Sequence, residues 1–216
     1  AFTAALGGTI EPVYVHNQMM RRVDAAFGMT ADGTAIVEVA QACGLELVKE
    51  DERNPMRATT YGVGELLSRA IKRGCRNFII GLGGSGTSDA GIGMLKALVD
   101  IFAKGKTFDD AMKTELGECR FTLACDVDNP LCGENGAAYV YAPQKGATPQ
   151  MVEQLDRRAK LFAEKSALHY GYDRSCCPGA GAAGGLGYAF MQYLGAEMRS
   201  GADMLLSLCR FDDVAK

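Results

Sequence analysis

The sequence predicts a single α/β domain built on a mixed sheet, with an antiparallel N-terminal part and flanking helices. Three observations predict this fold. Short segments over the first third alternate apolar and polar residues, two short apolar segments follow, and several stretches have helical periodicity. With 48% hydrophobic and 23% charged residues, the chain can form a sizeable core, which excludes a disordered protein. Neither an internal repeat nor a linker divides residues 1–216, so we expect one domain.

The first third of the chain predicts three strands. Residues 9–16, 24–29 and 34–39 alternate apolar and polar side chains, which is the period of a strand with one buried face. The Asp32-Gly33 pair between the second and third segments is typical of a tight hairpin turn. We therefore expect antiparallel pairing in this part of the sheet.

The rest of the chain predicts helices that alternate with buried strands. A helical period starts at Thr60, and Gly74 is placed to end it. The longest helix is expected to open at Thr148-Pro149, because Thr is a favoured N-cap and Pro a favoured first helical residue. Further helices are expected over 92–102 and 188–194, and buried strands over 77–82 and 121–127.

Charge and composition exclude several classes of protein. The net charge is −3 with mixed signs along the chain, so the sequence has no basic surface for nucleic acid or an anionic membrane. No apolar run approaches the roughly 20 residues that a membrane span needs. The eight cysteines lack paired metal-ligand spacing, and they are read as reduced thiols of a cytoplasmic protein. The oligomeric state is not indicated.

The two ends of the sequence favour a piece of a longer protein. The chain begins without Met, inside a stretch of small residues, and its last residues carry no terminating signal. We therefore expect further protein beyond the 216 residues.

Glycine, which accounts for 27 residues, is concentrated in loops, and the first such loop follows the strand expected at 77–82. Residues 81–86 satisfy the G-x-G-x-x-G pattern, in which glycines let an anion approach the backbone and a helix N-terminus offers free N–H groups. Asp89 would repel a phosphate bound directly beside it, so it fits better as a base, a metal ligand or a hydroxyl acceptor. The candidate anion-binding residues here are Gly83, Gly84, Ser85, Thr87 and Ser88.

A polar cluster follows the strand expected at 121–127. Asp126, Asp128 and Asn129 lie where ligand sites collect in α/β sheets, and two carboxylates with an amide suit Mg²⁺. The alternative is an Asx-turn in which Pro130 closes the strand. On composition alone, this alternative is slightly favoured.

The third loop, at 178–187, contains five glycines and no charge. Its glycines, Gly181 and Gly184 among them, would let a ligand or another backbone approach closely, and tight helix packing is the alternative. Gly146, together with Lys145, is a further candidate anion contact, although Lys145 is equally compatible with the surface.

Five motifs together give the chain a resemblance to one family. It resembles the type I glycerate kinases, bacterial enzymes that phosphorylate D-glycerate with ATP, over nearly its whole length and in the same order. The motifs that carry the resemblance are N-P-M-x-A-T-T-Y-G-V-G-E-L-L at 54–67, G-L-G-G-S-G-T-S-D-A-G at 81–91, A-C-D-V-D-N-P-L at 124–131, P-Q-K-G-A-T at 143–148 and P-G-A-G-A-A-G-G-L-G at 178–187.

The resemblance implies a fold and an activity. Family members also carry N- and C-terminal segments that build a Rossmann-like domain, absent here, into which the present domain is inserted. The substrate cleft lies between the two domains, so residues 1–216 alone are expected to be inactive. The expected reaction transfers the γ-phosphoryl group of ATP to D-glycerate, giving 2-phosphoglycerate rather than 3-phosphoglycerate, with Mg²⁺.

The roles of individual residues follow from chemical type and motif together. Asp89 is expected to accept or orient the hydroxyl proton, Asp126 to act in catalysis, and Asp126 with Asp128 to hold Mg²⁺. Asn129 is expected to position the substrate. The glycine-rich loops, with Gly181 and Gly184, are expected to contact the phosphoryl group or the glycerate carboxylate.

Two other classes of function stay open at this point. A dinucleotide-binding oxidoreductase domain could use the G-x-G-x-x-G at 81–86, although the ribose-binding acid expected about 20 residues further on is poorly placed. A non-catalytic interaction domain is the third reading. Titration with NADH against Mg-ATP separates the first of these from a kinase.

Overall fold

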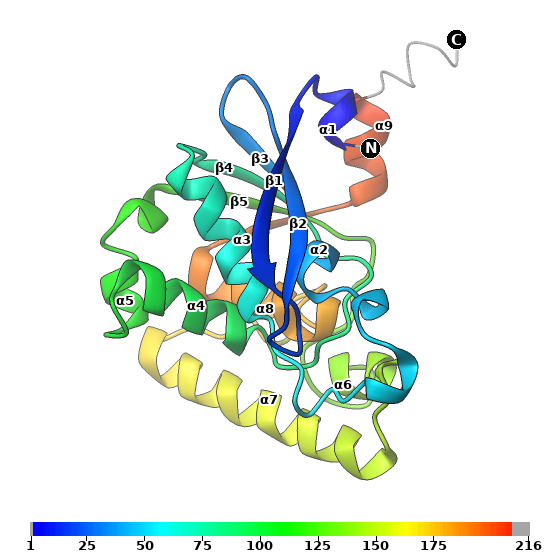
Figure 1. The fold of residues 1–216 in the computed structure, drawn as a ribbon. Helices are drawn as coiled ribbons and strands as arrows, with labels where there is room; N and C mark the ends of the chain where they lie inside the picture. Colours follow the sequence, from blue (N-terminus) through cyan, green and yellow to red (C-terminus); the bar gives the residue numbers. More distant parts are fainter. Residues whose placement is uncertain (1, 209–216) are drawn as a thin grey trace.

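A six-stranded mixed sheet organises the fold in the computed structural model, which describes residues 2–208 (Figure 1). The strands lie in the sheet in the order of the sequence. The first three pair antiparallel and the last four pair parallel, which confirms the predicted mixed sheet. The strands are β1 (Thr9–His16), β2 (Arg22–Met29), β3 (Thr34–Glu38), β4 (Asn77–Gly81), β5 (Arg120–Ala124) and β6 (Glu197–Arg199).

The turn between β2 and β3 forms at the predicted Asp-Gly pair. Gly33 adopts a φ of +79°, which a residue with a Cβ rarely adopts, and its N–H donates to the Thr30 carbonyl at 3.0 Å. The Asp32 carboxylate accepts from the Thr34 N–H at 3.3 Å. The predicted hairpin is confirmed.

Helices α3 and α4 lie side by side and connect the parallel strands β3, β4 and β5 (Figure 1). Helix α8 packs on β5, and α7 runs along the far side of the helical layer. Phe162 of α7 contacts Tyr188 and Tyr193 of α8, with ring centroids 5.8 and 5.6 Å apart. The helices are α1 (Phe2–Ala5), α2 (Ala40–Cys43), α3 (Tyr61–Lys72), α4 (Ile92–Phe102), α5 (Phe108–Ala111), α6 (Ala137–Tyr141), α7 (Pro149–Tyr170), α8 (Ala182–Leu194) and α9 (Gly201–Leu208).

The core fills the space between the sheet and these helices. Phe78 of β4 stacks on Phe121 of β5 at 4.9 Å, and Phe121 contacts Phe190 of α8 at 5.7 Å. The apolar face predicted for the helix after Thr60 is buried, at 2% exposure or less. It consists of Val63, Leu66, Leu67, Ala70 and Ile71.

Two boundaries next to the site differ from the predicted ones, and one strand was not predicted. The strand expected over 121–127 ends at Ala124, so the polar cluster lies in a loop. The helix expected over 188–194 starts at Ala182, and residues 183–185 inside it adopt left-handed φ angles. Strand β6 was not predicted, because three residues are too few to show an alternating pattern.

The short helices α1 and α9 contact one another near one edge of the molecule (Figure 1). Helix α1 also contacts β1, and α9 contacts β5. The two ends of the described chain therefore lie together. No helix within residues 2–208 is long and apolar enough to cross a membrane.

Candidate active site

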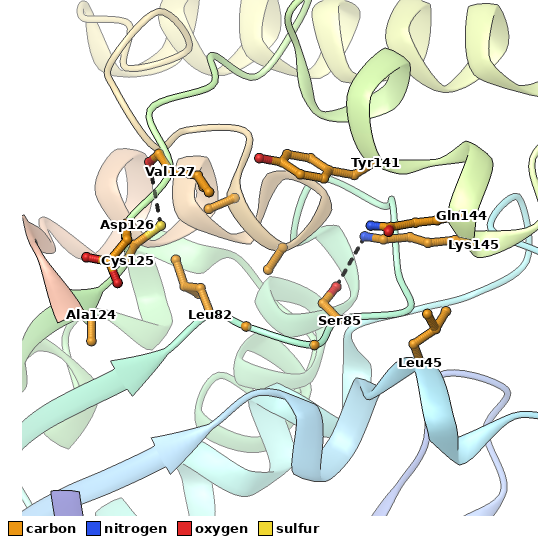
Figure 2. Close-up of a pocket in the computed structure, with 14 residues that line it drawn as sticks. Leu45, Leu82, Ser85, Ala124, Cys125, Asp126, Val127, Tyr141, Gln144 and Lys145 are labelled. Atoms are coloured by element: carbon orange, nitrogen blue, oxygen red, sulfur yellow. Dashed lines mark hydrogen bonds between the residues drawn. The ribbon is translucent and has the colours of Figure 1, made fainter. Parts of the chain in front are cut away.

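A pocket of about 440 Å³ opens where β4 and β5 end (Figure 2). The carboxyl ends of parallel strands are the usual place for ligands in α/β sheets, so the predicted loops meet at the expected edge. The loop after β4 and the segment after β5 form two walls, and Tyr141, Gln144 and Lys145 form a third. The first residues of α8, Ala182 and Ala183, complete the lining.

The loop after β4 is held on one side by backbone hydrogen bonds to residues 43–45, and its other side is exposed to the pocket. The Gly84 carbonyl accepts from the Leu45 N–H at 2.8 Å, and the Gly86 N–H donates to the Cys43 carbonyl at 2.7 Å. Gly83 and Gly84 are exposed and line the pocket. The N–H groups of Gly83, Gly84 and Ser85 find no protein acceptor within residues 2–208. These free backbone donors can bind an anion.

The hydroxyl side chains of this loop are buried. Ser85 lines the pocket, and its Oγ lies 3.2 Å from Thr87 Oγ1. Thr87 is fully buried and does not line the pocket. Ser88 Oγ is buried and has no hydrogen-bond partner among the described residues. Of the three predicted hydroxyls, the structure thus brings Ser85 directly to the cavity.

Lys145 is buried beside this loop, which excludes the surface reading. Only 2% of the residue is exposed, and Nζ donates to the Thr87 carbonyl at 2.6 Å. Nζ also donates to Ser85 Oγ at 3.4 Å (Figure 2). Within the described chain, no carboxylate lies within 4.0 Å of Nζ. Burial lowers the pKa of Lys145 to about 8, although Cys43 and Asp89 act in the opposite direction.

The Asp89 carboxylate ties together the starts of α3 and α4. Its Oδ2 accepts from the Thr60 N–H at 2.8 Å, from Thr60 Oγ1 at 2.9 Å and from the Gly93 N–H at 3.0 Å, while Oδ1 accepts from the Gly91 N–H at 3.1 Å. Burial raises the pKa of the Asp89 carboxyl, and these hydrogen bonds lower it in part. The geometry makes Asp89 a helix-capping residue that does not line the pocket. Its role as a base stays a prediction.

The polar segment after β5 divides into three environments. Asp126 lines the pocket, and its Oδ1 accepts from Ser200 Oγ at 2.9 Å, just before α9. Asp128 is exposed and does not line the cavity. Asn129 donates through Nδ2 to the Asn135 carbonyl at 2.8 Å and accepts from the Tyr141 hydroxyl at 2.6 Å.

The third loop packs against the other two. A Cβ on Gly184 would lie 2.0 Å from the Thr87 carbonyl oxygen, and one on Gly181 would lie 2.3 Å from the Pro130 oxygen. The Gly181 N–H already donates to the Asn129 carbonyl at 2.8 Å. Close approach of protein backbone therefore explains both glycines. Their contact with substrate stays a prediction.

The sequence named Lys145 only as a further candidate beside Gly146, and Tyr141 and Gln144 were not predicted as part of the site. In the pattern P-Q-K-G at 143–146, the glycine is the one residue that indicates a local structure, namely the end of a short helical turn. Gly146 has a φ of +92°, so it ends the short turn of 3₁₀ helix that carries Lys145. Nothing local in the sequence indicates that the lysine points inward.

The strand–loop site, with free N–H donors and a buried ammonium group, gives this α/β domain a pocket with the donor groups that an anion requires. A family model described as the glycerate kinase family matches residues 1–216. The chain is 39% identical over 238 residues to glycerate 2-kinase of Escherichia coli K12, and 38% identical over 234 residues to glycerate kinase of Bacillus subtilis 168. These alignments cover 99% and 98% of this chain.

A solved structure agrees with these relatives. A protein described as glycerate kinase 2 from Salmonella typhimurium LT2 superposes with a TM-score of 0.85, at 36% identity over 95% of this chain. The chain belongs to the glycerate kinase family. It spans about 60% of the length of the curated relatives and of the solved chain that it matches.

The dinucleotide-binding alternative is not favoured. The G-x-G-x-x-G motif starts at Gly81, the last residue of β4, and ends at Gly86. Helix α4 begins only at Ile92, six residues after the motif ends. A dinucleotide-binding loop instead leads directly into its helix. Both the loop geometry and the family therefore argue against an oxidoreductase domain.

Proposed function

We propose that this protein is a glycerate kinase, which transfers the γ-phosphoryl group of ATP to the 2-hydroxyl of D-glycerate to give 2-phosphoglycerate and ADP. The observation that carries the proposal is that free backbone N–H groups, Lys145 and the Asp126 carboxylate line one and the same pocket. The name of the Escherichia coli relative, glycerate 2-kinase, supports the 2-position.

Phosphoryl transfer depends on charge neutralisation and positioning more than on covalent chemistry. Gly83, Gly84 and Ser85 would donate hydrogen bonds to a phosphoryl or carboxylate oxygen in the pocket. Thr87 and Ser88 are buried and do not line the pocket, and their contact with substrate stays a prediction. Asn129 would position the substrate together with Tyr141, whose hydroxyl donates a hydrogen bond to Asn129 and which lines the pocket.

Magnesium is expected to accompany ATP, and Asp126 with Asp128 would hold it. Mg²⁺ in such sites binds one or two carboxylates together with substrate phosphates, and keeps several waters. The residues fit this mode, since Asp126 lines the pocket and Asp128 follows on the same exposed loop. No cluster of three metal-ligating side chains exists in the described part of the chain, which fits a metal that arrives with the nucleotide. The ion would neutralise phosphate charge.

We further propose that residues 1–216 form a domain inserted into a second, Rossmann-like domain. The contact between α1 and α9 supports this, because both connections to such a domain would leave the molecule at one place. The hydrogen bond from Ser200 to Asp126 puts the start of α9 beside the pocket, so the second domain would close over the cavity. Residues 1–216 alone are then expected to have no kinase activity.

The free thiols of the seven described cysteines support a cytoplasmic location.

The experiment measures ADP release from Mg-ATP in the presence of D-glycerate. It compares the full-length protein with a protein that consists of residues 1–216 alone. Phosphorus NMR of the product distinguishes 2-phosphoglycerate from 3-phosphoglycerate. Absence of glycerate-dependent ADP release in the full-length protein overturns the kinase proposal. A product phosphorylated at the 3-position overturns only the position, and an NADH-specific thermal shift would favour the dinucleotide alternative.

A further inference from the structure

We propose that Lys145 is the anion anchor of the pocket: its ammonium group binds a substrate oxyanion, a carboxylate or a phosphoryl group, against the Gly83–Ser85 loop. The identity of that oxyanion rests on the proposed function, but the existence of the site does not.

The ammonium group has one more donor than the protein uses. An ammonium carries three N–H bonds, and the protein accepts two of them, at the Thr87 carbonyl and Ser85 Oγ. Lys145 is 2% exposed, so solvent has little access to the third. Lys145 is among the residues that line the cavity (Figure 2), and we assign the remaining donor to a ligand bound there.

No group beneath the Gly83–Ser85 loop forms an ion pair with the ammonium in the described chain. Burial raises the pKa of the Cys43 thiol to about 12, which keeps it neutral. Asp89 attracts the ammonium from a distance, but its carboxylate is held by four other donors and lies beyond ion-pair range. Within the described residues, the buried charge therefore has no ion-pair partner, and the attraction by Asp89 offsets its burial only in part.

The groups across the cavity do not supply one either. Burial raises the pKa of both the Tyr141 hydroxyl and the Cys125 thiol, so neither is an anion at neutral pH. The Asp126 carboxylate is exposed, bonded to Ser200, and beyond ion-pair distance from Lys145. A buried cation without a counter-ion is costly, and an anion bound in the cavity would relieve that cost.

The backbone holds Lys145 in this orientation. The Lys145 N–H donates to the Ala142 carbonyl at 3.0 Å, and the Gly146 N–H donates to the Pro143 carbonyl at 3.0 Å. A Cβ on Gly146 would lie 3.1 Å from the Arg53 carbonyl oxygen, so the turn packs closely against another segment. The lysine is thus presented on a fixed turn, as an anion anchor requires.

The bound anion and the proton on Lys145 are linked. The ammonium is charged below its pKa of about 8, so anion affinity is expected to fall as the pH rises above 8. An arginine at this position stays charged across that range. The pH dependence therefore separates an anion anchor from a lysine that merely supports the Thr87 carbonyl.

The test measures calorimetric binding of three probes to the full-length protein: inorganic phosphate, ADP and D-glycerate. Lys145→Met is expected to weaken at least one probe by about 10- to 100-fold at pH 7, the range for a hydrogen bond to a charged group. Lys145→Arg is expected to bind within about threefold of wild type and to lose the decline between pH 7 and pH 9.5. Lys160→Met, on an exposed lysine of α7, is the matched control and is expected to change nothing.

The affected probe identifies the anion. Loss of D-glycerate binding alone assigns the substrate carboxylate to Lys145, and loss of phosphate and ADP binding assigns a phosphoryl group. If phosphate weakens in Lys145→Met while wild type does not bind D-glycerate, the anchor stands and the glycerate proposal fails. Equal affinities of Lys145→Met and wild type for every probe overturn the anchor, as does an Arg variant that keeps the alkaline decline. Thermal melts of each variant verify that it is folded.

Discussion

Replacing Lys145 by methionine is expected to make the protein more stable. The side chains have similar length, so methionine fills the same volume, and it needs no counter-ion in a buried position. Lys145 is 2% exposed and makes two hydrogen bonds to oxygen but no ion pair in the described chain. The wild-type protein therefore carries the cost of a desolvated charge whenever the pocket is empty.

The magnitude follows from the pKa of Lys145. Its ordinary value is 10.5 and the folded value is about 8, a difference worth about 3 kcal/mol. Above pH 10.5 both states are neutral and the cost is absent. As the pH falls from 10.5 to 8 the unfolded chain gains the proton first, so stability drops, and below 8 the full cost remains. Losing the bond to the Thr87 carbonyl offsets about 1–2 kcal/mol, which leaves a net gain of about 1–2 kcal/mol at pH 7.

The assay is urea denaturation of wild type and Lys145→Met in phosphate-free buffer at pH 7 and pH 10, with Lys160→Met as control. Between pH 7 and pH 10 the wild type is expected to regain about 2–3 kcal/mol of stability, so the advantage of the variant over wild type shrinks by that amount. A difference that stays constant with pH would refute the reasoning, since it would show that Lys145 is not a desolvated ammonium in the folded protein.

Four other substitutions test the remaining assignments. Asp89→Asn is expected to lower the free energy of unfolding by about 2–3 kcal/mol in urea titrations, because the amide cannot accept all four donors. Turnover of the full-length variant is expected to fall about 100-fold if Asp89 is the base, and turnover within about threefold of wild type contradicts that role. Gly184→Ala is expected to cost about 3 kcal/mol or more, from its φ of +68° and its 2.0 Å approach to the Thr87 oxygen. Gly83→Ala, with nothing within 4 Å, is expected to melt like wild type, and equal losses in the two would contradict the division of these glycines. Asp126→Asn is expected to raise several-fold the Mg²⁺ concentration that gives half-maximal ADP release, and an unchanged Mg²⁺ titration contradicts Asp126 as a metal ligand.

Local signals explain which parts of the fold were predictable. The Asp32-Gly33 turn needs a positive φ that glycine provides, and the apolar face of α3 repeats with the period of a helix. Both signals lie within a few consecutive residues. The order of strands in the sheet depends instead on contacts distant in sequence, so the position of β6 beside β5 could not be predicted. Likewise, nothing local marks Ala124 as the last residue of β5.

The sheet edge at which the candidate residues gather was predictable, but the surroundings of each residue were not. The rule that ligands bind at the carboxyl ends of parallel strands placed Asp126 at the edge where the pocket opens. Glycine is needed both where a ligand approaches the backbone and where another backbone does, so sequence alone could not separate Gly83 from Gly184. The structure separates them, since Gly83 faces open space and Gly184 meets the Thr87 carbonyl.

Lys145 could not be assigned from the sequence because lysine is almost always exposed, and P-Q-K-G is also typical of a surface turn. Because lysine is rarely buried, the burial of Lys145 calls for a specific reason. An apolar residue of the same length would fit this position and is expected to give a more stable protein, so packing does not explain a lysine here. An ammonium that costs stability in the empty pocket is instead explained by what it binds. The same substitution, Lys145→Met, should therefore raise stability and weaken anion binding, and a variant that did only one of these would separate the two effects.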